Sequence, residues 1–397
     1  MSRTAFQDRS AITGIGWTEF SRKSGRTVLA LATEASLRAI DDAGLRPEDI
    51  DGVVTYFHNA DTVPPRAIVH ALGLRQCHFQ IFNALGGGWA CAAVGAAAMA
   101  VHAGICENVL VYRAMNGQSE QHSPPSGPPG EDQWRAPFGV SHAAARFGPF
   151  VTAHMARFGT TSADLGLVAV TQRAHAALNA KAMMTSPLTL EEHQCSPWLI
   201  WPFRRADFCL RSDGAVAIVV SSAERALDLR HAPVLVTGFL GGTMAVALGT
   251  QGAEHPWQVN AHLAAPHLYG RAGVQPEDVD FAELYDPFSG MVLLHMEGFG
   301  LAAEGQAAAA FAAGRTTLDG DIPVNTHGGL LSEAYTHGLG HVIEAVQQLR
   351  PGGVCDDGCV SGEHDYDRGH CRQVRAPKLG LICGECGDSS LLLRAAA

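Results

Sequence analysis

Apolar residues follow two spacings along this chain, one typical of strands and one typical of helices. Short β-branched or apolar runs predict strands at residues 11–15, 53–56, 109–112, 215–220, 234–238, 281–284 and 379–382. An apolar stripe at helical spacing from Val28 to Ile40 predicts an amphipathic helix. Because helical stretches alternate with strands, we predict an α/β protein built in layers.

One stretch of sequence occurs twice. DAGLRPEDIDGV at 42–53 is matched by RAGVQPEDVDFA at 271–282, at a constant offset of 229 residues in the alignment of identical positions. Gly44 is placed to end the preceding helix in a left-handed cap, and Pro-Glu-Asp opens the next turn. The repeat is too long for a solenoid and indicates a duplicated half-domain. We predict an N-terminal half (1–228), with an inserted loop region at about 116–205, and a C-terminal half (229–397).

Two further segments differ in composition from their surroundings. Residues 90–101 are almost all Ala, Gly, Val and Met, which predicts a helix that is buried on every face. Residues 116–134 are rich in Ser, Gly and Pro, which predicts an irregular excursion. Such a loop could cover a pocket or meet a partner, and a solvated surface loop fits equally well.

Composition narrows the function classes. The chain has 397 residues, enough for two halves that each have a core, and a net charge of −11 argues against binding nucleic acid or an anionic membrane surface. No signal-peptide core or long apolar run is visible, so a cytoplasmic location is expected, with the ten cysteines as reduced thiols. Only three lysines are present, which weighs against Schiff-base chemistry.

Three motifs carry a family resemblance. They are DFCLRSDGA at 207–215, YDPF at 285–288 and NTHGGLLSEAY at 325–335. Together with the duplicated half-domain and the buried helix, they resemble the thiolase superfamily over essentially the whole chain, nearest to its sterol-carrier-protein and lipid-transfer-protein branch. The resemblance implies a thiolase fold, with two duplicated half-domains in a five-layer αβαβα arrangement, and an acyl-CoA substrate.

The catalytic positions depart from those of a thiolase. A thiolase carries its acyl group on a cysteine at the start of the buried helix. That position falls near Gly88 here, and Cys91 comes about one turn later, so we predict that Cys91 is a buried core residue. The two positions that form the thiolase oxyanion hole are occupied by Tyr285 and Tyr335. Two phenols are therefore expected to face one another across the reacting carbon, in a protein that is not a thiolase.

This replacement resembles the thiolase-like steroid aldolases, which cleave a 17-hydroxy C-20 carboxyl-CoA side chain to a 17-ketosteroid and propionyl-CoA. Retro-aldol cleavage of a β-hydroxyacyl-CoA needs a base, a donor to the enolate and an acid, and needs no covalent intermediate. We predict that Tyr285 and Tyr335 share these roles, in either order. His337 is a further candidate catalytic residue, and His337 or Asp286 would assist a basic tyrosine, since a free phenol has a pKa of ~10. No cofactor is expected, because CoA is part of the substrate.

Other possibilities remain open. The chain could be a non-catalytic acyl-CoA or lipid-binding scaffold, or an acyltransferase that uses Cys91. The C-terminal cysteines could hold a structural zinc, although their spacing is not a tight ribbon pattern and unligated thiols are favoured. A metal-dependent aldolase is not supported, because His327, His337 and His341 are too scattered in the sequence to argue a ligand set. The low-ranking zinc candidates are Cys355, Cys359, Cys383 and Cys386.

The resemblance also implies partners. Thiolases pair through their N-terminal halves, so a homodimer is expected. The aldolase branch works with a small OB-fold, zinc-ribbon protein, often part of the hydratase that makes the substrate, which here would give a heterotetramer. Neither nucleic acid nor a membrane is expected as a partner.

Overall fold

The computed structural model describes residues 6–58, 61–119, 132–140, 142–242, 255–350 and 371–396. Its strands are β1 (Ser10–Trp17), β2 (Gly52–Tyr56), β3 (Phe79–Asn83), β4 (Asn108–Met115), β5 (Trp198–Ile200), β6 (Phe203–Arg204), β7 (Gly214–Ser222), β8 (Val234–Leu240), β9 (Phe281–Glu283), β10 (Leu379–Cys383) and β11 (Ser390–Ala395). Its helices are α1 (Val28–Asp42), α2 (Pro65–Leu72), α3 (Ala90–His102), α4 (Asp132–Arg135), α5 (Ala143–Phe158), α6 (Ser162–Ala177), α7 (Leu190–Cys195), α8 (Ala223–Ala226), α9 (Ala261–Ala272), α10 (Ser289–Gly298), α11 (Ala307–Ala312), α12 (Gly329–Ser332) and α13 (Leu339–Leu349).

The large sheet shows the duplication directly. Its nine strands lie in the order β3-β2-β4-β7-β1-β8-β11-β10-β9. In the first half β2 pairs parallel with β4, which pairs antiparallel with β7, which pairs antiparallel with β1. The strands β9, β10, β11 and β8 repeat this pattern, and a parallel bridge between Ala282 and Val324 takes the place of β3. The exact division at 228/229 stays a prediction; it falls between β7 and β8.

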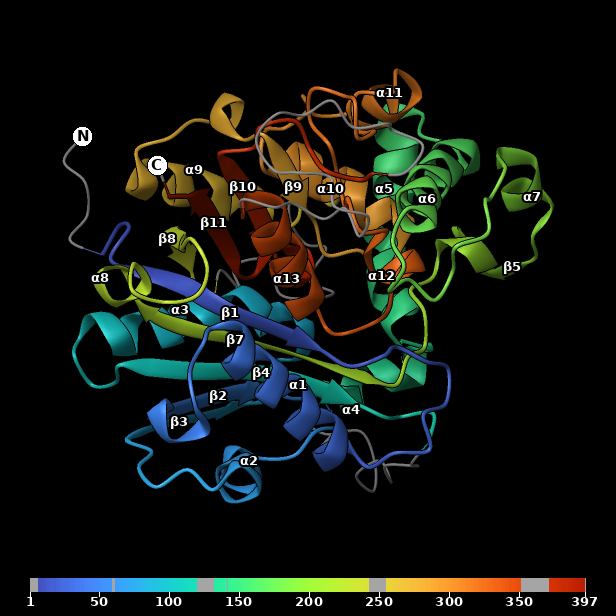
Figure 1. Ribbon diagram of the computed structural model, residues 1–397. Coiled ribbons are helices and arrows are strands. Elements are labelled where there is room, and N and C mark those ends of the chain that lie inside the picture. The colour runs from blue at the N-terminus through green and yellow to red at the C-terminus, as the bar shows by residue number, and fades with distance from the viewer. Residues whose placement is uncertain are drawn as a thin grey trace.

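The elements stack in five layers (Figure 1). Helix α1 covers the outer face of the first half-sheet, and α9 covers the outer face of the second. Helices α3 and α13 lie between the halves and contact strands of both. Three apolar clusters fill the three interfaces, so each half-sheet is buried on both faces. This is the predicted thiolase-type arrangement.

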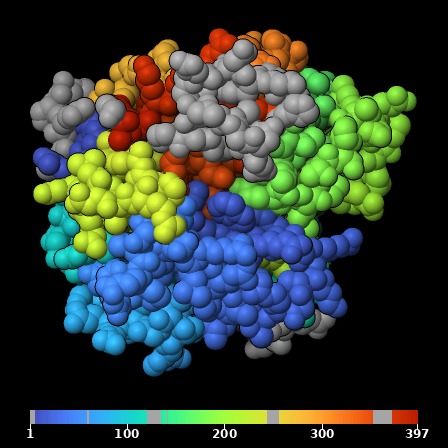
Figure 2. Space-filling model, in the orientation of Figure 1, coloured from blue at the N-terminus to red at the C-terminus, as the bar shows by residue number. Residues whose placement is uncertain are grey.

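The predicted inserted loop region is largely helical. It contains α5, α6, α7 and a small β5–β6 hairpin, and α5 and α6 pack against α10. In the space-filling view this segment forms the green right-hand side of the molecule (Figure 2). Of the predicted excursion at 116–134, residues 120–131 lie outside the described residues. Within the described ranges no helix is both long and apolar enough to cross a membrane.

The local predictions were confirmed where the sequence carries a strong signal. Gly44 and Gly273 have φ angles of +74° and +67°, the left-handed geometry expected after the repeated helix. The strands β3, β5, β6 and β11 were not predicted. β11 is rich in leucine, which intrinsically favours helix, and its pairing between β8 and β10 decides its conformation instead.

Helix α3 is buried as predicted, with Met99 the exposed exception along residues 90–101. Its small residues let neighbouring elements approach closely. A Cβ atom added to Gly95 would lie 2.1 Å from a ring carbon of Phe239 on β8, which belongs to the other half of the molecule. Gly95 is therefore required by the packing of the two halves.

We expect Gly95→Ala to lower the free energy of unfolding by about 1–3 kcal/mol, because the added methyl group must displace the Phe239 ring. Chemical denaturation measures the change. Gly270→Ala is the matched control, since its Cβ would meet nothing within 4 Å in helix α9 and should raise stability by about 0.5–1 kcal/mol. An equal gain from both substitutions would contradict the packing argument.

Candidate active site

Two tyrosines meet between the C-terminal end of β9 and the segment that precedes α13. Tyr285 follows β9, and Tyr335 follows α12. Their hydroxyl oxygens lie 3.1 Å apart and form a hydrogen bond. Tyr285 is buried, whereas Tyr335 is only partly buried. The two phenols that the sequence predicts to face one another therefore do so.

A glycine-rich turn before α3 makes room for this pair. A Cβ atom on Gly87 would lie 2.1 Å from the Tyr285 hydroxyl oxygen, so position 87 accommodates only glycine. A Cβ on Gly88 would instead approach the Asp388 carboxylate, at 3.1 Å. The sequence assigned the supporting role to Gly88. That role stays a prediction, and the structure shows that the glycine facing Tyr285 is Gly87.

Buried polar side chains fix the loops that carry the tyrosines. The Asn325 side chain accepts a hydrogen bond from the Leu284 N–H (2.6 Å) and donates one to the Leu284 carbonyl (2.9 Å). The Asp286 carboxylate accepts hydrogen bonds from the N–H groups of Leu330 (2.9 Å) and Leu331 (3.2 Å) and contacts Nε2 of His341 (3.0 Å). Asp286 therefore supports the site by tying loops together, and not, as predicted, by assisting a tyrosine hydroxyl.

His337 lies beside the pair, with its ring edge-to-face with Tyr335 at a centroid distance of 4.7 Å. Its Nδ1 accepts a hydrogen bond from Nε of the buried Arg113 (3.1 Å), which also pairs with Asp61. Because Nδ1 is the acceptor, Nε2 carries the proton. Burial, together with the charges of Arg113 and His58, holds the pKa of His337 well below its usual range. His337 is thus a neutral hydrogen-bond donor.

Burial also determines the protonation of the tyrosines. It raises the pKa of Tyr285 and of Tyr335 well above the usual value for a phenol. Both hydroxyls therefore keep their protons at neutral pH and act as donors. The predicted use of one of them as a base, helped by His337 or Asp286, stays a prediction, and burial opposes it by making the phenolate less stable.

A carboxyl group that the sequence analysis missed lies near the pair. Glu385 is half-buried in the turn η6 (Glu385–Gly387), and burial raises its pKa while Arg146 opposes the shift. Its charge in turn raises the pKa of both tyrosines. The signal was the motif CGECG directly after the predicted strand 379–382, of which only the cysteines were considered.

The described thiols near the site are not activated nucleophiles. The Cys91 thiol is buried, contacts the Ile382 carbonyl (3.6 Å) and has a pKa that burial raises well above the usual value. Burial likewise raises the pKa of Cys209 to about 12. Since the thiolate is the nucleophilic form, an acyltransferase that uses Cys91 is not supported.

The low-ranking zinc site at the C-terminal cysteines stays a prediction. Cys383 and Cys386 are buried, and burial raises the thiol pKa of Cys383 to about 12 and that of Cys386 well above the usual value. Cys355 and Cys359, the other two candidate ligands, lie outside the described residues. Cys371 is disulfide-bonded, which contradicts the prediction that every cysteine is a reduced thiol.

A cavity of about 430 Å³ lies against Tyr335, within the size range of ligand sites. Much of its wall is apolar, and polar groups are few. The lining residues are Met115, Gly117, Gln118, His142, Ala143, Ala144, Phe208, Cys209, Leu210, Arg211, Ser212, Phe288 and Tyr335. Tyr335 thus lines this cavity and is hydrogen-bonded to the buried Tyr285.

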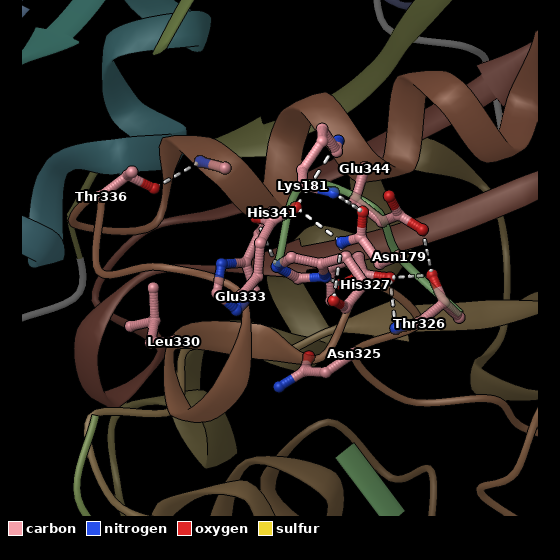
Figure 3. A network of polar contacts seen from close by, with 12 residues as sticks. Asn179, Lys181, Asn325, Thr326, His327, Leu330, Glu333, Thr336, His341 and Glu344 are labelled. Carbon is pink, nitrogen blue, oxygen red and sulfur yellow. Dashed lines mark hydrogen bonds and ion pairs between the residues drawn. The ribbon is translucent and has the colours of Figure 1, made fainter. Parts of the chain in front are cut away.

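A second polar cluster lies deeper in the same half of the molecule (Figure 3). The rings of His327 and His341 meet edge-to-face with centroids 4.8 Å apart, and Nδ1 of His327 lies 2.9 Å from a carboxylate oxygen of Glu283. Although burial opposes it, Glu283 and Glu333 raise the pKa of His327 to about 9. The sequence analysis judged the histidines too scattered to form a ligand set, but His327 and His341 do lie together. The loop after Val324 carries one of them to the helix α13 that carries the other.

Comparison with known proteins gives consistent matches. Residues 250–356 match the family described as thiolase C-terminal domain-like. The steroid side-chain-cleaving aldolase of Thermomonospora curvata is 40% identical, with 89% of this chain and 93% of that protein covered. The 17-hydroxy-3-oxo-4-pregnene-20-carboxyl-CoA lyase of Mycobacterium tuberculosis is 39% identical, with 86% and 92% covered. The solved Ltp2-ChsH2(DUF35) aldolase superposes with a TM-score of 0.88 at 38% identity and covers 99% of each chain.

We expect His337 to remain neutral through the pH range in which an ordinary histidine titrates, around its pKa of ~6.5, because burial and Arg113 oppose its charged form. Histidine-labelled NMR should show Nε2–H and no titration step there. Arg113→Gln should shift the pKa of His337 upward by removing the neighbouring charge.

The same depressed pKa links His337 to stability. The unfolded chain binds a proton at this residue below ~6.5 and the folded chain does not, so its contribution should lower the free energy of unfolding as the pH falls from that point. A His337 signal that titrates near ~6.5 would rule out the neutral assignment.

Proposed function

This chain belongs to the thiolase-fold steroid side-chain aldolases, and on that basis we propose that it cleaves a β-hydroxyacyl-CoA by a retro-aldol reaction. The proposed substrate is a 17-hydroxy steroid C-20 carboxyl-CoA, which gives a 17-ketosteroid and propionyl-CoA. The observation that carries the proposal is the hydrogen-bonded pair Tyr285–Tyr335, with hydroxyls 3.1 Å apart beside a largely apolar cavity. A donor pair without an activated thiol suits enolate chemistry and not acyl transfer.

The proposed reaction transfers one proton overall. A base removes the β-hydroxyl proton, the oxygen forms a carbonyl, and the electrons of the broken carbon–carbon bond move into the thioester as an enolate. Tyr335, which lines the cavity, donates to the enolate and then protonates its α-carbon, and the proton held by the base passes to the Tyr335 oxygen to restore the phenol. Tyr285, behind it, supports Tyr335 through their shared hydrogen bond. The reaction needs no cofactor beyond the CoA of the substrate.

The proposed base is Glu385. Its raised pKa makes its carboxylate a better proton acceptor than an ordinary glutamate, and it is close enough for its charge to act on both tyrosines. His337, a neutral donor beside Tyr335, would add a hydrogen bond to the developing negative charge. In this assignment Tyr335 and His337 are the catalytic donors, whereas Tyr285, Asp286 and Gly87 position them.

The proposed partners follow from the family and from the exposed edge strand of the large sheet. The similar solved structure is an Ltp2-ChsH2(DUF35) aldolase, so we propose that this chain also works with a small partner protein, of the OB-fold zinc-ribbon kind, in a heterotetramer. The strand β3 lies at the end of the sheet, and Phe82 and Leu85 are exposed there. Pairing of two chains through this edge would cover both residues and gives the proposed homodimer.

Tyr285→Phe and Tyr335→Phe should each lower kcat/KM by at least about 100-fold, because Tyr335 supplies the proton and Tyr285 holds the Tyr335 hydroxyl through their shared hydrogen bond. The assay follows propionyl-CoA and 17-ketosteroid by mass spectrometry, with and without a co-expressed OB-fold partner. Cys91→Ala is the control and should leave cleavage intact. If the wild-type protein cleaves nothing in either preparation, the chain is better described as a non-catalytic scaffold. If only Cys91→Ala abolishes cleavage, acyl transfer is favoured instead.

Glu385→Gln should lower kcat/KM by about 100-fold or more and remove the acid limb of the pH–rate profile, because an amide cannot accept the hydroxyl proton. That limb should lie above the ordinary glutamate pKa of ~4.3, since burial raises the pKa of Glu385. Glu277→Gln changes an exposed glutamate of the repeated Pro-Glu-Asp turn and serves as the matched control. An unchanged pH profile in Glu385→Gln would assign the base to another group.

A further inference from the structure

We propose that Glu283, His327 and His341 form a buried binding site for one divalent transition-metal ion, zinc by its donor set, deeper than the tyrosine pair. Ligand atoms of these three side chains all lie within 4.8 Å of one another, and all three residues are buried. Two imidazoles and one carboxylate are a common ligand set for zinc. The proposal concerns metal content and does not depend on the proposed reaction.

The first argument is that the cluster leaves polar atoms without hydrogen bonds. Oε2 of Glu283, Nδ1 of His327 and Nδ1 of His341 are buried and have no hydrogen-bond partner. The 2.9 Å contact between Glu283 and His327 satisfies the distance for an ion pair but not the direction of a hydrogen bond. A buried unpaired polar atom is costly, and a bound cation would satisfy all three at once.

The second argument is that the other atoms of these side chains are already fixed. Nε2 of His341 lies 3.1 Å from the Leu284 carbonyl and 3.0 Å from the Asp286 carboxylate, and both of these groups can only accept. Nε2 therefore carries the proton of a neutral ring, and Nδ1 keeps a lone pair. This is the tautomer that a metal-binding histidine adopts when a carboxylate holds its other nitrogen. Oε1 of Glu283 is likewise held by Thr326, at 2.8 Å from its hydroxyl.

The third argument is charge. Among the described contacts of this network, Arg372 pairs with Glu344 at 2.8 Å and Lys181 lies 3.5 Å from Glu333 (Figure 3). The carboxylates of Glu283 and Asp286 have no side-chain partner that is always cationic in these contacts. One divalent cation would balance these two charges with both histidines neutral.

The site would join the elements that carry the tyrosines. Glu283 ends β9 two residues before Tyr285, His327 belongs to the loop that leads to α12 and Tyr335, and His341 is on α13. The His341 ring lies 6.4 Å from the Tyr285 ring, so the metal would not touch the reacting atoms from this position. Its role would be to position these loops, with the ion captured as the chain folds.

The test is the metal content of the full-length chain purified from cells supplied with zinc. We expect about one zinc per wild-type chain, and a loss to background in Glu283→Gln and in His341→Gln. His193→Gln is the matched control: it disrupts another fully buried histidine, paired with Asp207 at 2.8 Å, and should keep its zinc. Folding of each variant is checked by circular dichroism.

Cobalt substitution of the wild-type chain decides the ligand type even where a variant fails to fold. Nitrogen and oxygen ligands should give visible d–d bands without the intense thiolate-to-cobalt transition that cysteine ligands produce. Wild-type protein that folds without metal would overturn the proposal and leave a protonated His327 paired with Glu283. Metal with a thiolate signature, or metal retained in both folded variants, would also overturn it by placing the ion elsewhere.

Discussion

The hydrogen bond between Tyr285 and Tyr335 is the interaction on which the site depends, and neither residue could hold it alone. The two phenols come from separate segments, 50 residues apart in the chain. Asn325 binds the backbone of Leu284, and Asp286 binds the start of α12 and His341, so each tyrosine segment is tied to the other by buried side chains. Because these ties are buried, they resist competition from water and fix the distance between the hydroxyls.

Burial then determines what the pair can do. The same loss of solvent raises the pKa of both phenols and lowers the pKa of His337, so all three groups are neutral and carry a proton. A site of neutral donors stabilises negative charge that develops during a reaction and supplies no nucleophile. Burial also raises the pKa of Glu385, and the carboxylate therefore accepts a proton more readily than that of an ordinary glutamate.

The sequence predicted features that depend on a local pattern or on a repeated motif. It missed features that depend on distant segments being packed together. The strands, the buried helix and the two tyrosines each have a signal within a short window. His327 and His341 are 14 residues apart with a turn and a helix start between them, so their contact follows only from the packing of α13. The choice between Gly87 and Gly88 depends on which Cα faces Tyr285, a one-residue register that spacing does not resolve.

The same register explains why position 87 must be a glycine beside this tyrosine pair. The space beside Gly87 holds the Tyr285 hydroxyl, and a Cβ atom there would approach it to 2.1 Å, far inside contact distance. Tyr285 cannot withdraw, because its backbone is fixed between β9 and Asp286. Any side chain at this point of the turn would therefore displace the phenol. A glycine at position 87 and a phenol at position 285 therefore depend on each other, because only one of the two positions can carry a side chain into this space.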